Sequence, residues 1–357
     1  MNSQNRILFG FSLFFIAVLL FSCATTPKFR DAGGKVIPDS IAELGTIPID
    51  GVDTFISLRS SSINNPIILY VPGGPGMPEL PIIRHYNARL EERFLVAYWE
   101  PPGTCKSYER GIAEEKIKIE RLLSDIHEVI SYLKNRFGAE KVYLAGHSWG
   151  SILVMLYAQK YPEDLFAVIG IGQIVNIVEA EILSYRYTLE QAKKQGNEKA
   201  AEELMTVGNP PQYVSMEGDW YQKFLLKWRW SMKFGVMFYG NAGYWDLVRC
   251  SINSPEYSLF DMISYNAGRR LSVHALAREM MVIDLNAQAP RIDVPVYFLI
   301  GRHDIFRETE SFKRYAKSLD SPSKEVIWFE ESGHLPYVDE PDRFNETLFR
   351  ILDETTP

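Results

Sequence analysis

The stretch that decides the fold is Lys141-Val142-Tyr143-Leu144-Ala145-Gly146-His147-Ser148-Trp149-Gly150. Its first half is a short apolar run, which is typical of a strand buried on both faces of a parallel sheet. A helical pattern begins at Ser151. A sharp strand-turn-helix connection needs small residues two positions before and after its apex, and Gly146 and Gly150 supply them. The sequence therefore predicts that Ser148 projects from a tight turn at the end of a strand.

Other short apolar runs alternate with helical patterns on both sides of this stretch. Such alternation predicts an α/β unit, with a mostly parallel sheet and helices on both faces. The expected strands are residues 52–58, 67–71, 94–99, 141–145, 166–171, 294–300 and 325–329, and the expected helices are 119–137, 151–161, 308–319 and 341–352.

The pattern changes between residues 174 and 290, where helical periodicity dominates and aromatic residues crowd together. We interpret this interval as a helical lid whose aromatic residues collectively line an apolar pocket. The aromatic set is Trp220, Tyr221, Trp228, Trp230, Phe234, Phe238, Tyr244 and Trp245. The predicted divisions are a signal peptide at 1–22, a tether at 23–45, an α/β core at 46–173 and 291–357, and the lid at 174–290.

The amino terminus has the features of an export signal. Arg6 precedes an apolar run at 7–21, which is shorter than the roughly 20 residues that span a bilayer. Leu20-Phe21-Ser22-Cys23 resembles the lipobox of bacterial lipoproteins, in which the cysteine is acylated. The resemblance implies an exported protein held on the cell membrane or outer membrane through Cys23. An uncleaved anchor and a plain signal peptide are the alternatives.

A serine hydroxyl becomes a good nucleophile only when an oriented base removes its proton. Asp304 follows the strand expected at 294–300, and His334 follows the strand expected at 325–329. The carboxyl ends of parallel strands share one edge of the sheet, so both should lie near Ser148. We expect Ser148 to be the nucleophile, His334 the base and Asp304 its acid. The alternatives are His147 or His303 as the base, and Glu330 or Glu331 as the acid.

Acyl transfer also requires donors for the developing oxyanion. One expected donor is the backbone N–H of Trp149, directly after the nucleophile. The other should come from the loop Pro72-Gly73-Gly74-Pro75-Gly76, where glycines allow the backbone to approach a substrate closely. A phosphate-binding loop is the rival interpretation, but the Lys-Ser/Thr ending of such loops is missing.

These residues together resemble the α/β-hydrolase superfamily, and within it the prolyl iminopeptidase branch, over Val52 to the end of the chain. The order Ser148, Asp304, His334 is the one expected for that fold. The stretch 73–76 is similar to the branch's His-Gly-Gly-Pro-Gly, and 146–151 to its Gly-x-Ser-Trp-Gly-Ser. The resemblance implies that Gly74 N–H is the second oxyanion donor, with Gly73 as the fallback.

The sequence also departs from that branch. Pro72 stands where the family has His, and residues 100–107 lack the Gln and Arg of its Asp-Gln-Arg-Gly-x-Gly-x-Ser motif. The lid lacks the Glu with which the peptidases bind the substrate's amino terminus. The lid carboxylates that could replace it are Glu179, Glu181, Glu217 and Asp219. The resemblance therefore carries over the catalytic machinery but not the aminopeptidase specificity.

Composition narrows the function classes further. The 357 residues have a net charge of −7 and no long basic stretch, so nucleic acid is not an expected partner. Cys105 and Cys250 are expected to be separate buried thiols. No zinc-like Cys/His spacing is present, and neither a metal nor an organic cofactor is expected. We predict a serine hydrolase that cleaves an ester or amide bond of a small molecule or short peptide. A proline-type aminopeptidase and a non-catalytic binding protein are the alternatives.

Overall fold

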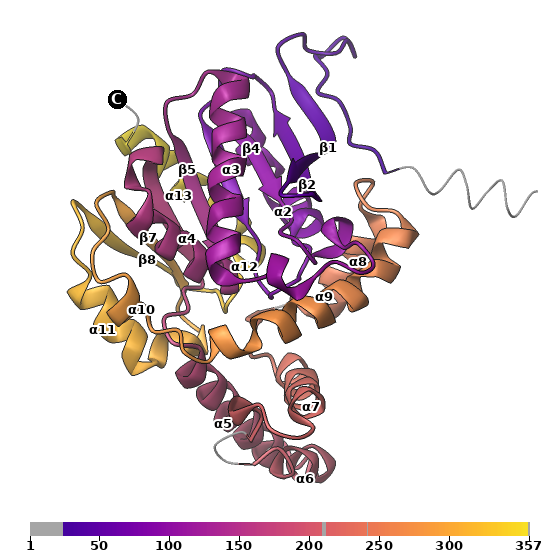
Figure 1. The fold of residues 1–357 in the computed structure, drawn as a ribbon, viewed down its shortest axis with the longest axis vertical. Helices are drawn as coiled ribbons and strands as arrows, with labels where there is room; N and C mark the ends of the chain where they lie inside the picture. Colours follow the sequence, from indigo (N-terminus) through magenta and orange to yellow (C-terminus); the bar gives the residue numbers. More distant parts are fainter. Residues whose placement is uncertain (1–23, 209–211, 241, 356–357) are drawn as a thin grey trace, which may run out of the picture.

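The computed structural model describes residues 24–208, 212–240 and 242–355, which are centred on an eight-stranded sheet (Figure 1). The strands lie in the order β1-β2-β4-β3-β5-β6-β7-β8. β2 pairs antiparallel with β1 and β4, and the other neighbouring pairs are parallel. The strands are β1 (Ile41–Ile49), β2 (Val52–Ser60), β3 (Ile67–Val71), β4 (Leu95–Trp99), β5 (Val142–His147), β6 (Leu165–Ile171), β7 (Val296–Gly301) and β8 (Lys324–Phe329).

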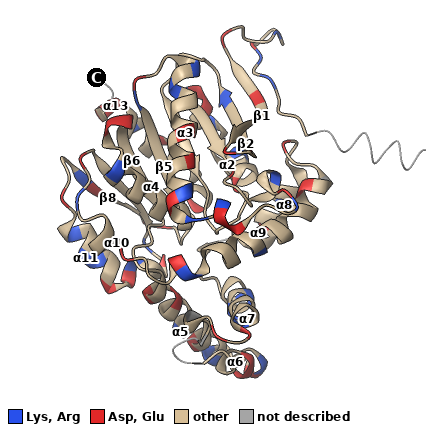
Figure 2. Ribbon diagram, viewed as in Figure 1, with Lys and Arg blue, Asp and Glu red and all other residues tan. Residues whose placement is uncertain are grey.

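Helices cover both faces of the sheet, which confirms the predicted fold class. α3, α4, α10 and α11 pack on one face, and α2, α12 and α13 on the other (Figure 1). Strands β3 to β7 contain no Lys, Arg, Asp or Glu, as expected for strands buried on both faces, and they are tan in Figure 2. These helices are α2 (Leu80–Asn87), α3 (Ile119–Phe137), α4 (Trp149–Lys160), α10 (Leu285–Gln288), α11 (Glu310–Ser318), α12 (Pro336–Asp339) and α13 (Pro341–Thr355).

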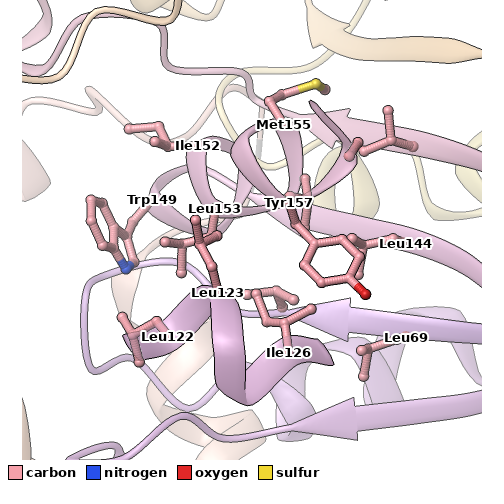
Figure 3. Packing of buried hydrophobic residues seen from close by; sticks show 14 of the residues in the cluster. Leu69, Leu122, Leu123, Ile126, Leu144, Trp149, Ile152, Leu153, Met155 and Tyr157 are labelled. Atoms are coloured by element: carbon pink, nitrogen blue, oxygen red, sulfur yellow. The ribbon is translucent and has the colours of Figure 1, made fainter. Parts of the chain in front are cut away.

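Helix α3 illustrates how the sequence pattern produces this packing. Its apolar residues recur at helical spacing, so they form one buried stripe. Figure 3 shows Leu122 and Ile126 of α3 in the same buried cluster as Trp149 of α4. The helix ends at Gly138, which has the left-handed conformation (φ 68°) that favours glycine. The predicted helix at 119–137 is therefore confirmed with its predicted bounds.

The chain before the sheet is packed more closely than the tether predicted at 23–45. β1 already begins at Ile41. Ahead of β1, the Thr25 N–H donates a hydrogen bond to the Pro255 carbonyl at 2.8 Å. The predicted tether is therefore wrong in its second boundary, and its described part contacts the folded unit. β1 lies at the edge of the sheet and is only partly buried, so its apolar pattern is too weak to reveal it.

Three predictions concern the membrane and the thiols. The signal peptide predicted at 1–22 and the predicted acylation site Cys23 lie outside the described residues. In the part of the chain that the structure describes, none of the helices combines the length and the apolar character needed to cross a bilayer. Cys105 and Cys250 are buried free thiols, which confirms that they do not pair.

Between β6 and β7 the chain leaves the sheet and forms helices in the interval where a lid is predicted. α5, α6 and α7 extend below the sheet in Figure 1. The two ends of this helical insertion meet, because Asn176 and Asp284 form a β-bridge and the Leu285 N–H donates to the Val175 carbonyl at 3.0 Å. Its helices are α5 (Ile177–Lys194), α6 (Glu198–Met205), α7 (Trp220–Lys233), α8 (Tyr244–Asn253) and α9 (Leu259–Met280).

Candidate active site

Ser148 lies between the last residue of β5 and the first residue of α4. Its backbone φ is 51°, a value that non-glycine residues rarely adopt, and its N–H donates to the Ile171 carbonyl at 2.9 Å. A Cβ on Gly150 would lie 2.3 Å from the Val71 carbonyl oxygen, and a Cβ on Gly146 would lie 2.4 Å from the Gly150 oxygen. Close backbone packing therefore requires both glycines, and it holds the serine in a strained turn.

Asp304 and His334 are in direct contact. The Asp304 Oδ2 atom lies 2.7 Å from His334 Nδ1, and both side chains are buried. Asp304 Oδ1 accepts a hydrogen bond from the Phe306 N–H at 2.9 Å, which orients the carboxylate. The second ring nitrogen of His334, Nε2, has no hydrogen-bond partner among the described residues. Because buried polar atoms without partners are rare, this nitrogen is available to a group in the adjoining cavity.

A cavity of about 170 Å³ is lined both by residues of the helical insertion and by several of the predicted site residues. Ser148, Trp149, Gly74 and His334 all line it. Asp304 lies behind His334 and is not part of the lining. The cavity thus contains a hydroxyl, an imidazole and the two residues expected to supply oxyanion donors, which is the set of groups that acyl transfer requires.

The two candidate oxyanion donors of the Gly-rich loop, Gly73 and Gly74, differ in the structure. The N–H of Gly73 donates to the buried carboxylate of Glu79 at 3.1 Å, so it is already engaged. Gly74 has φ 121°, and a Cβ at this position would lie 2.7 Å from the Gly76 nitrogen. Only glycine fits this conformation without strain. The geometry favours Gly74 over the fallback Gly73.

The predicted aromatic set divides into three groups. Trp220, Trp228 and Phe238 line the cavity, as predicted. Trp230 and Phe234 instead stack on each other, with ring centroids 5.8 Å apart, in a small core inside the insertion. The remaining members include exposed rings, of which the most exposed is Trp245 at 70%. The prediction that the whole set lines the pocket is therefore correct only in part.

Of the alternative base and acid residues, His147 lines the same cavity as Ser148. Both ring nitrogens of His147 are engaged by neighbouring oxygens. The ring of His303 stacks on Tyr239 with centroids 3.5 Å apart. Glu330 forms an exposed ion pair with Arg302 at 2.6 Å. In the described ranges, no group of three or more His, Cys, Asp or Glu side chains is placed to hold a metal ion.

A buried polar network around Glu79 was not predicted from the sequence. Glu79 Oε1 lies 2.7 Å from His147 Nδ1, and Glu79 Oε2 accepts from the Tyr70 hydroxyl at 3.1 Å as well as from Gly73 N–H. The Tyr337 hydroxyl also donates to Glu79 Oε1, at 3.3 Å. Burial, together with the nearby Glu79 carboxylate, raises the pKa of both tyrosines well above its usual value, so they remain donors. No motif or spacing marks Glu79, which follows the Gly-rich loop.

One lid carboxylate faces the cavity. Glu181 lines it and forms an ion pair with Lys227, whose side chain is only 4% exposed and also lines the cavity. Glu217 and Asp219 are exposed, and Glu179 is absent from the lining. The carboxylate that reaches the cavity is therefore already neutralised by a lysine.

Comparison with known proteins identifies the fold. Residues 66–201 match the family described as alpha/beta hydrolase fold. The chain has the α/β-hydrolase fold, and it is similar to proteins named proline iminopeptidases. It is 29% identical over 317 residues to a probable aminopeptidase of Bacillus subtilis, covering 88% of this chain and 98% of that protein. It is 22% identical to a proline iminopeptidase of Thermoplasma volcanium, again covering 88% and 98%.

Solved structures share the fold at lower sequence identity. A proline iminopeptidase-related protein of Thermus thermophilus superposes with a TM-score of 0.63 at 18% identity, covering 89% of this chain and 99% of that chain. A bacterial membrane phospholipase A has a TM-score of 0.57 at 17% identity, covering 88% and 86%. At such identities the likeness establishes the α/β-hydrolase fold and no particular activity.

Proposed function

We propose that the protein is a serine hydrolase that cleaves an ester or amide bond of a small substrate. Ser148 is the nucleophile, His334 the general base and Asp304 the acid that orients it. The observation that carries this proposal is the Nε2 atom of His334, which has no partner among the described residues, while Nδ1 is held by Asp304 at 2.7 Å. Ser148 lines the same cavity as His334, so its hydroxyl is the natural partner of that free nitrogen.

The geometry supports an acyl-enzyme mechanism. His334 Nε2 accepts the Ser148 proton as Oγ attacks the carbonyl carbon, and Asp304 stabilises the resulting imidazolium. The backbone N–H groups of Trp149 and Gly74 donate to the oxyanion. The imidazolium then protonates the leaving group. In the second half, His334 activates a water molecule that hydrolyses the acyl-enzyme and restores the serine hydroxyl.

The cavity favours a substrate with an uncharged, apolar acyl part. Its lining includes Ile174, Phe224, Met237 and Val273, which offer only apolar surface. Of the two carboxylates in the lining, Glu79 is held in its polar network and Glu181 is paired with Lys227. A free amino terminus would have to displace this lysine, whereas an acyl chain would not.

Active-site labelling tests the proposal. A fluorophosphonate probe should label the full chain, and labelling should disappear in Ser148→Ala. The matched control is Ser184→Ala, which removes another hydroxyl from the cavity lining and should leave labelling intact. A folded wild-type protein that is not labelled would instead support the non-catalytic binding protein.

Aminopeptidase activity is the second candidate, because Glu181 does reach the cavity and the relatives named above include aminopeptidases. Turnover of a proline arylamide and of a short acyl ester should be compared in the wild type and in Glu181→Gln. If the protein is a serine hydrolase without aminopeptidase specificity, ester turnover should exceed arylamide turnover, and Glu181→Gln should leave ester turnover unchanged. Arylamide turnover that predominates and falls at least tenfold in Glu181→Gln would favour the aminopeptidase.

We also propose that Cys23 is acylated and anchors the protein to a membrane. The support is the sequence Leu20-Phe21-Ser22-Cys23 after the apolar run at 7–21. Mass spectrometry of the mature amino terminus should show a lipid-modified Cys23, and Cys23→Ser should move the protein out of the membrane fraction. An unmodified amino-terminal Cys23 would contradict the anchor while leaving the hydrolase proposal untouched.

A further inference from the structure

Large apolar side chains that are exposed to solvent gather on one part of the helical insertion. Six such side chains are more than half exposed in the described part of the chain, and four of them lie on α8 or the first turns of α9. These four are Trp245 (70%), Ile252 (67%), Phe260 (58%) and Ile263 (71%), and we call them the docking face. Isolated exposed apolar residues are ordinary, but a group on two consecutive helices calls for a partner.

On each helix, the docking face lies on the side opposite to the one that packs against the rest of the protein. Trp245 and Ile252 are seven residues apart and therefore lie on the same side of α8, while Leu247 lines the active-site cavity from the other side. Phe260 and Ile263 lie on one side of α9. On the opposite side of α9, the Tyr265 hydroxyl contacts Met77, which lines the cavity. The two helices thus form a wall with the cavity on one side and the docking face on the other.

The start of the described chain lies beside the same two helices. The Thr25 N–H donates to the Pro255 carbonyl at 2.8 Å, and the Thr26 hydroxyl donates to Glu256 at 3.1 Å. Pro255 and Glu256 belong to the turn that joins α8 to α9, and Figure 1 shows the beginning of the described chain beside it. Only Ala24 separates Thr25 from Cys23. Two residues span at most about 7 Å, so a lipid on Cys23 or an uncleaved apolar run would emerge at this turn.

We propose that the docking face of α8 and α9 rests on the lipid surface to which the amino terminus is anchored. Tryptophan favours the boundary between headgroups and acyl chains, and phenylalanine and isoleucine enter the acyl region. Arg249 lies between Trp245 and Ile252 on α8 with its side chain 76% exposed; one of its nitrogens lies 3.3 Å from Asp246, and the rest of the guanidinium can contact lipid phosphate. The inference rests on the proposed membrane anchor and not on hydrolysis.

A second copy of the chain is a poorer occupant for this face. Stable dimers bury about 800 Å² and roughly 20–30 residues on each partner, whereas the docking face has four apolar side chains. A membrane surface needs no such area, because an anchored protein is already held next to it at high effective concentration. A small apolar face that would not sustain a dimer can therefore hold an anchored protein in one orientation.

Fluorescent labelling of the full chain tests this orientation. Ile263→Cys and, separately, Phe260→Cys would carry an environment-sensitive NBD label, since Cys105 and Cys250 are buried. The matched control is Val282→Cys, which is 73% exposed and lies beyond the far end of the 22-residue α9, about 33 Å away along the helix. The proteins would be reconstituted in phosphatidylcholine–phosphatidylglycerol vesicles that contain nitroxide-labelled lipid.

Membrane docking predicts a blue-shifted emission at residues 260 and 263 and nitroxide quenching at least threefold greater there than at 282. Equal, weak quenching at all three positions would overturn the proposal. A second result would also overturn the proposal: the labels at 260 and 263 become solvent-exposed when the protein is diluted a hundredfold in lipid. That result would identify a contact between copies of the chain. A chain that does not float with the vesicles would overturn it as well. Esterase turnover in solution is unaffected by any of these outcomes, so failure here is distinguishable from failure of the hydrolase proposal.

Discussion

The Glu79 carboxylate lies 2.7 Å from His147 Nδ1, although the two residues are 68 positions apart in the chain. His147 directly precedes Ser148, and the second oxygen of Glu79 accepts the N–H of Gly73 at 3.1 Å. A single buried side chain thus connects the turn that carries Ser148, the proposed nucleophile, with the loop that carries Gly74. This relationship sets the distance between the two parts of the site that must act on one carbonyl group.

Replacing Glu79 should therefore impair catalysis more than substrate binding. In Glu79→Gln the amide nitrogen cannot accept, so either the Gly73 N–H loses its acceptor or His147 Nδ1 has to accept instead of donate. We expect kcat on a short ester to fall about 10- to 100-fold with KM changed less than threefold, because oxyanion donors act mainly in the transition state. Steady-state kinetics measures this split. Glu115→Gln, an exposed control, should leave both constants unchanged, and a Glu79→Gln enzyme with wild-type kcat would refute the positioning role.

Asp304→Asn should test the orientation of His334. The amide oxygen should keep the bond from the Phe306 N–H, so the amide NH2 would face Nδ1 and favour the tautomer that is protonated on Nε2. The neutral amide also cannot stabilise the imidazolium, so kcat should fall about 10⁴-fold while the protein remains folded. Near-ultraviolet circular dichroism should be unchanged, and Asp293→Asn on the surface serves as the control. Activity within tenfold of the wild type would show that another carboxylate performs this role.

Gly150→Ala should prevent stable folding. The added Cβ would lie 2.3 Å from the Val71 carbonyl oxygen, and neither strand β3 nor helix α4 can shift without disturbing the core. We expect a loss of about 3 kcal/mol or more in the free energy of unfolding, seen in urea titration or as insoluble protein. Gly45→Ala is the control, because a Cβ at that position meets nothing within 4 Å. Comparable stability of the two variants would argue against the close packing of β3 and α4.

Glu100 should make the fold less stable as the pH rises. Burial raises the pKa of this carboxyl from 4.5 to about 8. Between these values the unfolded chain ionises while the folded protein keeps the proton, so the unfolding free energy should fall by up to about 1.4 kcal/mol per pH unit. The contribution is fully present below pH 4.5 and is lost by about pH 8.

Glu100→Gln resembles the protonated form and can still bond the Lys106 N–H, which lies 2.7 Å from the carboxylate in the wild type. Urea titrations at pH 5, 6, 7 and 8 should give a flatter pH dependence for this variant than for the wild type. Glu115→Gln should follow the wild type. Parallel curves for Glu100→Gln and the wild type would show that Glu100 ionises normally.

The sequence was informative where local chemistry is specific. Apolar runs bounded by glycine and proline revealed buried strands of the parallel sheet, and the helical stripe of 119–137 predicted both ends of α3. Asp304 and His334 could be selected because each follows such a strand. Their direct contact is a long-range relationship, which no local pattern contains.

The features that the sequence did not predict correctly share a physical cause. β1 is an exposed edge strand, so burial does not impose an apolar pattern on it. Glu79 is a single polar residue whose role depends on His147 and Tyr337, which arrive from distant segments. The aromatic residues of the lid look alike in sequence, yet Trp228 lines the cavity and Trp245 faces outward. Helical periodicity does not say which side of a helix will meet the sheet.

The bridge between Asn176 and Asp284 has a consequence for how this protein can change. Because the insertion leaves and rejoins the sheet at one point, its helices can be exchanged, lengthened or lost without altering the path of β6 or β7. The proposed reacting groups lie next to the ends of sheet strands, whereas the insertion forms one wall of the cavity and part of the outer surface. Selection can therefore alter which molecules reach Ser148 through one exchangeable module, provided that the bond from the His334 N–H to the Met237 carbonyl of the insertion is kept.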